Sequence, residues 1–132
     1  MINGEIVFCI SDNETLEINM GTEILPTKVI NKGDVIALGR RAPMNKWMFK
    51  IAYDGETEFI TSLEKMVNQL YNVKEYVNEL IQRYAEVNLM INMRSEFAEM
   101  GCSIPSDIIK KISELNCSLD FRILSFGMAI NS

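Results

Sequence analysis

The clearest pattern in the chain is a strand–helix–strand unit over residues 87–126. Residues 87–94 alternate between apolar and mainly polar side chains, which is the period of a strand with one buried face. A helix with one apolar stripe begins near Pro105, and a second alternating stretch follows it. In that stretch Asp120 and Arg122 share one face, and the apolar face is formed by Leu119, Phe121 and Ile123. Such a crossover usually brings its two strands side by side, or nearly so, in one sheet.

The first half of the chain contains further strand patterns. Residues 5–11 carry apolar side chains on both faces, which favours a central strand covered on both sides. Residues 47–53 alternate between apolar and other positions and predict another strand. Between them, residues 24–30 favour an extended conformation. Pro26 indicates an edge position for this segment, because proline cannot donate a ladder hydrogen bond.

A short helix is expected directly after the first strand, over residues 14–20. Asp12 or Asn13 can accept its first backbone N–H groups, and Gly21 can end it in a left-handed conformation. Residues 35–45 show no clear period and include a glycine and a proline, so we predict a loop there.

Two amphipathic helical stretches, residues 59–70 and 73–84, precede the strand–helix–strand unit. Each has one apolar stripe and one charged face, which is typical of a helix that lies on a sheet. Asn72 lies between them, and the pattern fits either one kinked helix or an angled pair. We therefore predict one α+β domain over residues 1–132. It has a mixed, mostly antiparallel sheet of about five strands, amphipathic helices packed on that sheet and a C-terminal β-α-β unit.

The composition argues against several classes of protein. The 132 residues suffice for one domain with a buried core, and no stretch approaches the roughly 18 apolar residues that span a bilayer. No signal peptide is visible and the three cysteines form no C-x-x-C pair, so we expect a cytoplasmic protein with no membrane partner. The absence of histidine removes the usual general base and the commonest metal ligand. We expect no catalytic residue, no metal and no cofactor, and hence no enzyme.

The net charge of −5 is unevenly distributed along the chain. Residues 27–50 contain six basic residues and one acidic residue, a net charge of +5, so the remaining residues carry −10. An acidic protein binds nucleic acid poorly because phosphate contacts dominate that affinity, so we expect no nucleic acid partner. The basic segment is either a solvated loop or a site for a phosphate or an acidic partner.

Two interpretations of this basic segment are open. Lys32, Arg40 and Arg41 can surround an anion, with Trp47 as a stacking wall. Alternatively, residues 32–34 form a turn and Trp47 is a core anchor. We favour the second interpretation because Trp47 shares its strand face with three other apolar side chains, Phe49, Ile51 and Tyr53.

Several motifs follow one another along the chain. They are Met20-Gly-Thr-Glu-Ile-Leu-Pro-Thr, then Asn31-Lys-Gly-Asp, then Trp47 in a strand, and finally Leu115-Asn-Cys-Ser-Leu-Asp. From about residue 5 to 126 the chain resembles the small bacterial proteins of the domain-of-unknown-function family four-two-seven-nine, whose motifs read L-G-x-x-P-T, K-G-D/E and L-G-A-x-L-D. Met20 and Asn116 depart from that pattern. The resemblance implies the fold but no activity, although some members look like partners encoded beside bacterial toxins.

Two functions from different classes are expected. The first is a bacterial immunity protein that neutralises a cognate toxin by direct binding. Its contact residues would lie in the basic loop or on the acidic helix faces, and we single out Lys32, Asp34, Arg40, Arg41, Lys46, Glu75 and Glu79. The alternative is a small-ligand or phosphate-binding domain that uses the basic loop 31–46. In either case we expect a monomer or a weak homodimer.

Overall fold

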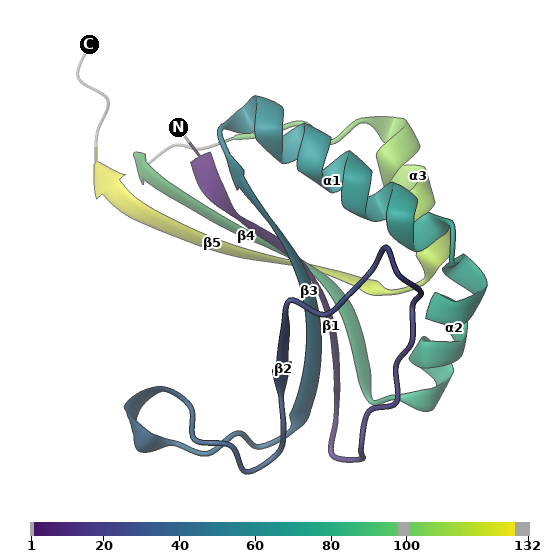
Figure 1. Ribbon diagram of the computed structural model, residues 1–132. Helices are drawn as coiled ribbons and strands as arrows, with labels where there is room; N and C mark the ends of the chain where they lie inside the picture. The colour runs from purple at the N-terminus through teal and green to yellow at the C-terminus, as the bar shows by residue number, and fades with distance from the viewer. Residues whose placement is uncertain (1, 98–100, 129–132) are drawn as a thin grey trace.

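A computed structural model of the chain describes residues 2–97 and 101–128 (Figure 1). Five strands form one sheet in the order β2–β3–β1–β4–β5. The strands are β1 (Ile2–Asp12), β2 (Lys28–Ile30), β3 (Asn45–Asp54), β4 (Glu86–Phe97) and β5 (Ser118–Met128). All neighbouring strands are antiparallel except β4 and β5, which are parallel. The predicted α+β fold with a mixed, mostly antiparallel sheet is confirmed.

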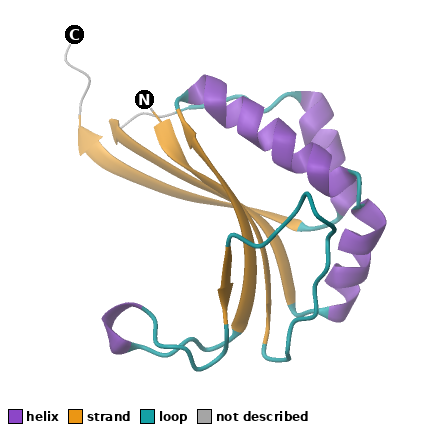
Figure 2. Cartoon of the chain, viewed as in Figure 1, coloured by secondary structure: helices purple, strands orange, loops and turns teal. Residues whose placement is uncertain are grey.

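Three helices lie together on one side of this sheet (Figure 2). They are α1 (Glu56–Tyr71), α2 (Lys74–Arg83) and α3 (Ser106–Leu115). The break at Asn72 and Val73 makes α1 and α2 two separate helices rather than one kinked helix. Asn116 ends α3 in a left-handed conformation with a φ of 61°, a position that glycine usually fills and asparagine also tolerates. Within the described residues, no helix is both long enough and apolar enough to cross a membrane.

The main core lies between the helices and one face of the sheet. Phe8 of β1 and Leu89 of β4 are fully buried there against Phe59 and Leu63 of α1. Trp47 is 6% exposed, and its ring meets the ring of Phe8 edge to face at a centroid distance of 6.5 Å. Trp47 is therefore a core anchor and not a stacking wall.

The expected short helix over residues 14–20 is absent, and that prediction was wrong. The segment between β1 and β2 is irregular. The Tyr84 hydroxyl accepts a hydrogen bond from the N–H of Glu17 at 2.9 Å, and the Tyr76 hydroxyl accepts one from the N–H of Asn19 at 3.0 Å. The side chains of Tyr76 in α2 and of Tyr84 directly after α2 thus satisfy N–H groups that a local helix would otherwise satisfy. Tertiary contacts therefore override the local pattern.

Strand β1 is central in the sheet and buried on both faces, as its apolar residues predict, but only one face is covered by helices. The three α-helices cover the face that carries Ile6, Phe8 and Ile10, and none of them lies on the other face, which we call the open face. Val7 and Cys9 nevertheless are only 2% and 5% exposed on the open face. Neighbouring side chains within the sheet bury them, namely Met48, Ile30 and Met90. Apolar residues on both faces of a strand therefore do not require two covering layers here.

Candidate functional site

The first candidate region is the loop of residues 31–44 between β2 and β3, which we call the β2–β3 loop. Its two arms pair through backbone hydrogen bonds, from Gly33 N–H to the Ala42 carbonyl at 2.9 Å and from Ala42 N–H to the Asp34 carbonyl at 2.7 Å. The Asp34 carboxylate accepts the N–H of Asn31 at 2.8 Å, and Arg41 Nη1 donates to the Gly33 carbonyl at 2.9 Å. Asp34 and Arg41 therefore hold the loop in shape.

The tip of the β2–β3 loop presents an exposed leucine. Leu38 is 95% exposed and has a φ of 60° and a ψ of 31°, in the left-handed region. A bulky residue in this region is an outlier, and the conformation costs roughly 1–3 kcal/mol. Val35, in the same loop, is 66% exposed. Strained, exposed apolar residues on loops occur mainly where a protein makes functional contacts.

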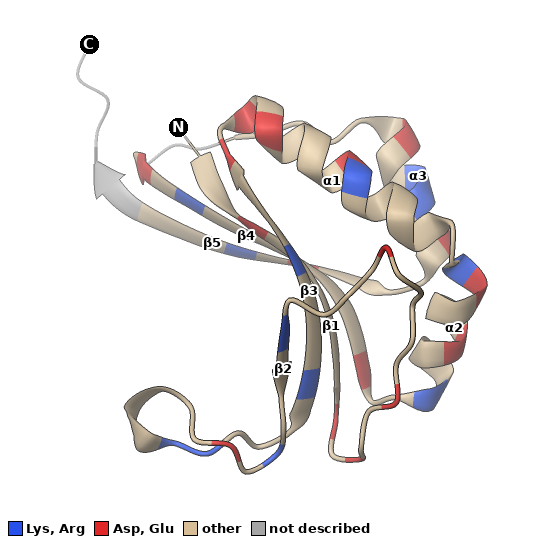
Figure 3. Ribbon diagram, viewed as in Figure 1, with Lys and Arg blue, Asp and Glu red and all other residues tan. Residues whose placement is uncertain are grey.

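Two predicted cations flank this apolar tip. Arg40 lies two residues after Leu38, and Lys32 is in the opposite arm; both side chains are exposed. Neither forms an ion pair within the described part of the chain. The β2–β3 loop extends away from the body of the sheet (Figure 3). The tip thus combines an accessible leucine with available positive charge.

The second candidate region is a groove of about 280 Å³ on the open face, which we call the open-face groove. All five strands contribute to its lining. The apolar part of the lining consists of Val7, Cys9, Ile30, Met48 and Met90. The charged part consists of Lys28, Lys46, Lys50, Arg122 and Glu86, and the uncharged polar part of Ser11, Asn88 and Asn92. The groove therefore has apolar surface together with a net charge of +3 among its lining residues.

The available cations of the open-face groove favour an anionic ligand, and an unpartnered acceptor beside them favours a hydrogen-bond donor on the same ligand. Lys50 Nζ lies 3.8 Å from a carboxylate oxygen of Glu5, whereas Lys28, Lys46 and Arg122 form no ion pair within the described residues. The side-chain oxygen of Asn92 is buried and has no hydrogen-bond partner, a state that costs free energy unless a ligand or water occupies the groove. The arrangement can bind charge but includes no strained or activated nucleophile.

The structure divides the predicted basic segment between the two regions. Lys46 lines the open-face groove, whereas Lys32, Asp34, Arg40 and Arg41 belong to the β2–β3 loop and do not line the groove. Lys32 is joined to the sheet only through its backbone N–H, which donates to the side chain of Asn45 at 2.7 Å. One anion site built from all the predicted cations is therefore not formed.

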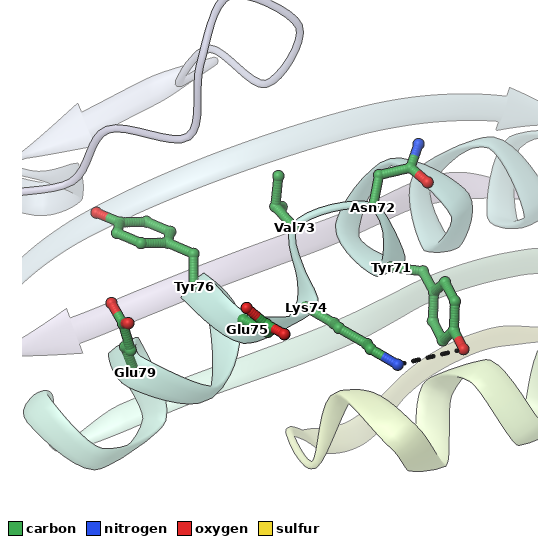
Figure 4. Close-up of a pocket in the computed structure, with 7 residues that line it drawn as sticks. All are labelled: Tyr71, Asn72, Val73, Lys74, Glu75, Tyr76 and Glu79. Carbon is green, nitrogen blue, oxygen red and sulfur yellow. Dashed lines mark hydrogen bonds between the residues drawn. The ribbon is translucent and has the colours of Figure 1, made fainter.

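Glu75 and Glu79 lie on α2, beside a hollow of about 560 Å³ at the junction of α1 and α2 (Figure 4). Three of its polar side chains, those of Tyr71, Lys74 and Tyr76, are engaged within the protein. Lys74 Nζ lies 3.5 Å from the Tyr71 hydroxyl and 4.7 Å from the centre of the Tyr71 ring. The Tyr76 hydroxyl accepts the N–H of Asn19. The two glutamates therefore form an acidic helix surface rather than the lining of an enclosed site.

The three cysteines give no support for thiol chemistry. Burial raises the pKa of the Cys117 thiol, and burial together with the nearby Glu56 carboxylate raises the pKa of the Cys102 thiol. A raised pKa keeps a thiol protonated at neutral pH, where it is a poor nucleophile. Cys9 is buried at the bottom of the open-face groove, with its sulfur 3.6 Å from the Ser11 hydroxyl. Among the described residues, no group of three acidic or cysteine side chains is placed to hold a metal ion.

Sequence reasoning missed Leu38 and most of the groove residues. Leu38 had no signal beyond its position in a loop, since its left-handed conformation cannot be read from the residue type. Lys28 and Lys50 lie within the basic segment. The alternation of side chains along a strand was a signal that could have placed them on one face of the sheet. Arg122 is remote in sequence, and only the parallel pairing of β5 with β4, which sets Arg122 opposite Asn92, brings it to the groove.

Comparison with known proteins assigns the family. The family model described as Domain of unknown function (DUF4279) matches residues 3–125, which is nearly the whole chain. No curated protein and no solved structure matched. The match confirms the resemblance that the motifs indicated. These motifs lie in the loop before β2, in the β2–β3 loop, at Trp47 in β3, and from the end of α3 into β5. The chain therefore belongs to the family Domain of unknown function (DUF4279).

Proposed function

We propose that this protein is a protein-binding module that neutralises a bacterial toxin by direct binding, and that the β2–β3 loop is its main contact. The observation that carries the proposal is the 95% exposed Leu38, held in a left-handed conformation at the loop tip. The free protein gains nothing from an exposed, strained leucine, whereas a leucine that enters a pocket of a partner is a typical interface anchor.

The chemistry of the loop defines the surface that it fits. Leu38 requires an apolar pocket, and Arg40 and Lys32 require carboxylates at the rim of that pocket. Asp34 and Arg41 hold the loop in advance of binding, which lowers the entropic cost of association. Some members of the family look like partners encoded beside bacterial toxins, and this supports a toxin as the partner.

The test begins with the product of the adjacent gene in the native host, purified and titrated with this protein. We expect a stoichiometric complex, with Leu38→Asp raising the Kd by roughly thirtyfold or more, as for a central interface anchor. Leu38→Gly removes the same contact and relieves the left-handed strain, so it should weaken binding while the melting temperature stays unchanged or rises. Loss of binding without loss of stability separates a contact role from a structural one.

A matched control lies on the acidic surface of α2. Glu75→Lys combined with Glu79→Lys should leave the Kd unchanged if the loop is the contact. If the α2 variant abolishes binding and Leu38→Asp does not, the loop proposal is wrong and the acidic helix face is the contact. Co-expression tests the toxin assignment separately: the wild-type chain should restore growth of cells that produce the partner, and a harmless partner would refute that part.

The open-face groove favours a second candidate function, the binding of a small anionic ligand with an apolar part. The available cations Lys28 and Lys46 support the anionic part of such a ligand, and the unpartnered side-chain oxygen of Asn92 supports a hydrogen-bond donor on it. Inorganic phosphate and a panel of nucleotides are the probes, with the melting temperature as the readout. Lys28→Ala with Lys46→Ala should remove any stabilisation, and Arg40→Ala with Arg41→Ala should preserve it. No stabilisation by any probe would reject this function.

A further inference from the structure

The two edges of the sheet are built differently. β2, at one edge, is three residues long, follows Pro26 closely and carries Lys28, all of which protect an edge from pairing with another strand. β5, at the other edge, is 11 residues long, contains no proline and pairs on one side only with the strands that the structure describes. Its outer side therefore presents a long row of backbone donors and acceptors that no described strand pairs with.

β5 also exposes large apolar side chains next to that edge. Phe121 and Ile123 lie opposite Ile91 and Met93 of β4, on the face of the sheet that the helices cover. Ile91 and Met93 are buried, whereas Phe121 and Ile123 remain 47% and 59% exposed. The helices thus leave the edge of their own face uncovered, and another strand beside β5 would bury it.

We propose that β5 pairs antiparallel with β5 of a second copy of this chain, with Phe121 on the two-fold axis. The pairing joins two five-stranded sheets into one continuous sheet. In this register residue 120 lies opposite residue 122 of the second copy, and residue 119 lies opposite residue 123. Each Asp120 then meets Arg122 of the other copy on the open face, while Phe121 meets its own counterpart and Leu119 meets Ile123 on the helix-covered face.

Charge selects this register over its neighbours. A two-fold axis perpendicular to the continuous sheet keeps the open faces of both copies on the same side. The axis must therefore pass through a residue position of β5, and each neighbouring register places it one residue further along the strand. An axis at residue 120 sets Asp120 against Asp120, and an axis at residue 122 sets Arg122 against Arg122; like charges directly opposite each other destabilise a pair. The axis at Phe121 avoids both and forms two ion pairs. Neither Asp120 nor Arg122 has an ion-pair partner within the described part of one chain.

The first test is the mass of the full chain in solution over a range of concentrations, measured by light scattering after size exclusion. The wild-type chain should reach twice its 15.1 kDa. Asp120→Arg and Arg122→Asp each place like charges opposite one another at two positions, and each should weaken dimerisation by roughly a hundredfold. A mixture of these two variants should form a heterodimer, and the double variant should dimerise again. Restoration in the mixture also shows that the single variants fold.

The second test fixes the axis by disulfide formation. Phe121→Cys brings two thiols directly opposite each other, at a separation that a disulfide can bridge, and should give a covalent dimer under mild oxidation. Ile123→Cys is the matched control, since its thiols would lie roughly 13 Å apart along the strands and should remain unlinked. A wild-type chain that stays monomeric at every concentration would overturn the proposal. So would single-charge variants that dimerise normally, or equal cross-linking of both cysteine variants. These readouts do not depend on toxin or ligand binding.

Discussion

The Tyr53 hydroxyl donates a hydrogen bond to the backbone carbonyl of Asn92 at 2.7 Å, across the backbone of Gly4. Gly4 of β1 lies between Tyr53 of β3 and the neighbouring segment of β4 in the sheet. A side chain on Gly4 would fill the space that this contact uses. The contact ties three central strands together on the helix-covered side of the sheet. It therefore makes Gly4 and Tyr53 sensitive to substitution.

Gly4→Ala should destabilise the protein by about 1–3 kcal/mol, the usual cost of overpacking. A Cβ at this position would overlap the carbonyl oxygen of Asn92, and a strand backbone cannot move aside without breaking its ladder. Chemical denaturation measures the change in the free energy of unfolding. Gly101→Ala is the matched control, because a Cβ there has no atom within 4 Å and should change stability little. Equal stabilities for the two variants would contradict the close approach.

Tyr53→Phe should cost about 1 kcal/mol, because the Asn92 carbonyl loses a hydrogen bond. It should also change how the free energy of unfolding depends on pH. Burial raises the pKa of Tyr53 to about 12 from the usual 10.0, so the folded state favours the neutral phenol. The stability that the folded state gains with the neutral phenol is fully present below pH 10 and is lost as the pH rises from 10 towards 12. Unfolding experiments between pH 9 and 12 should show a steeper loss of stability for wild type than for Tyr53→Phe.

Asp12→Ala should destabilise the protein at neutral pH and reduce its sensitivity to acid. The Asp12 carboxylate accepts the backbone N–H of Glu14 at 2.9 Å and that of Ala85 at 2.8 Å, and these bonds lower the pKa of Asp12 below its usual 3.8. Because the pKa of Asp12 is lower in the folded state, the stability that its hydrogen bonds contribute is present above pH 3.8. This contribution disappears as the pH falls through the pKa of the folded state. Thermal unfolding at pH 7 and near pH 2.5 should show a smaller difference between the two melting temperatures for the variant than for wild type.

Asn92→Leu should leave stability unchanged or increase it, because the substitution removes a buried oxygen that has no hydrogen-bond partner. If the open-face groove binds a ligand that donates a hydrogen bond to the Asn92 oxygen, the same variant should lose stabilisation by that ligand. The melting temperature with and without ligand measures both effects. A marked fall in the melting temperature of the free variant would show that the Asn92 side chain has a structural partner.

The fold could be predicted in most of its elements because its signals are local and strong. Alternation in residues 87–94 and 119–123, with an amphipathic helix between them, favours two parallel strands side by side or nearly so, and β4 and β5 are indeed neighbours. The helix over residues 14–20 failed for the opposite reason. Its capping residues were suitable, yet Tyr76 and Tyr84, remote in sequence, took the backbone N–H groups of that segment.

The sequence alone determined the strands, the main helices, the edge position near Pro26 and the burial of Trp47, because periodicity and residue preferences act between near neighbours. Only the tertiary structure decided where binding chemistry gathers. The sheet order brings Arg122 to the lysines of β2 and β3 in one groove, and the closure of the β2–β3 loop sets Leu38 at its tip in a left-handed conformation. The position of a side chain on a shared face depends on strand pairing, and strand pairing is settled by contacts between residues that are far apart in the chain.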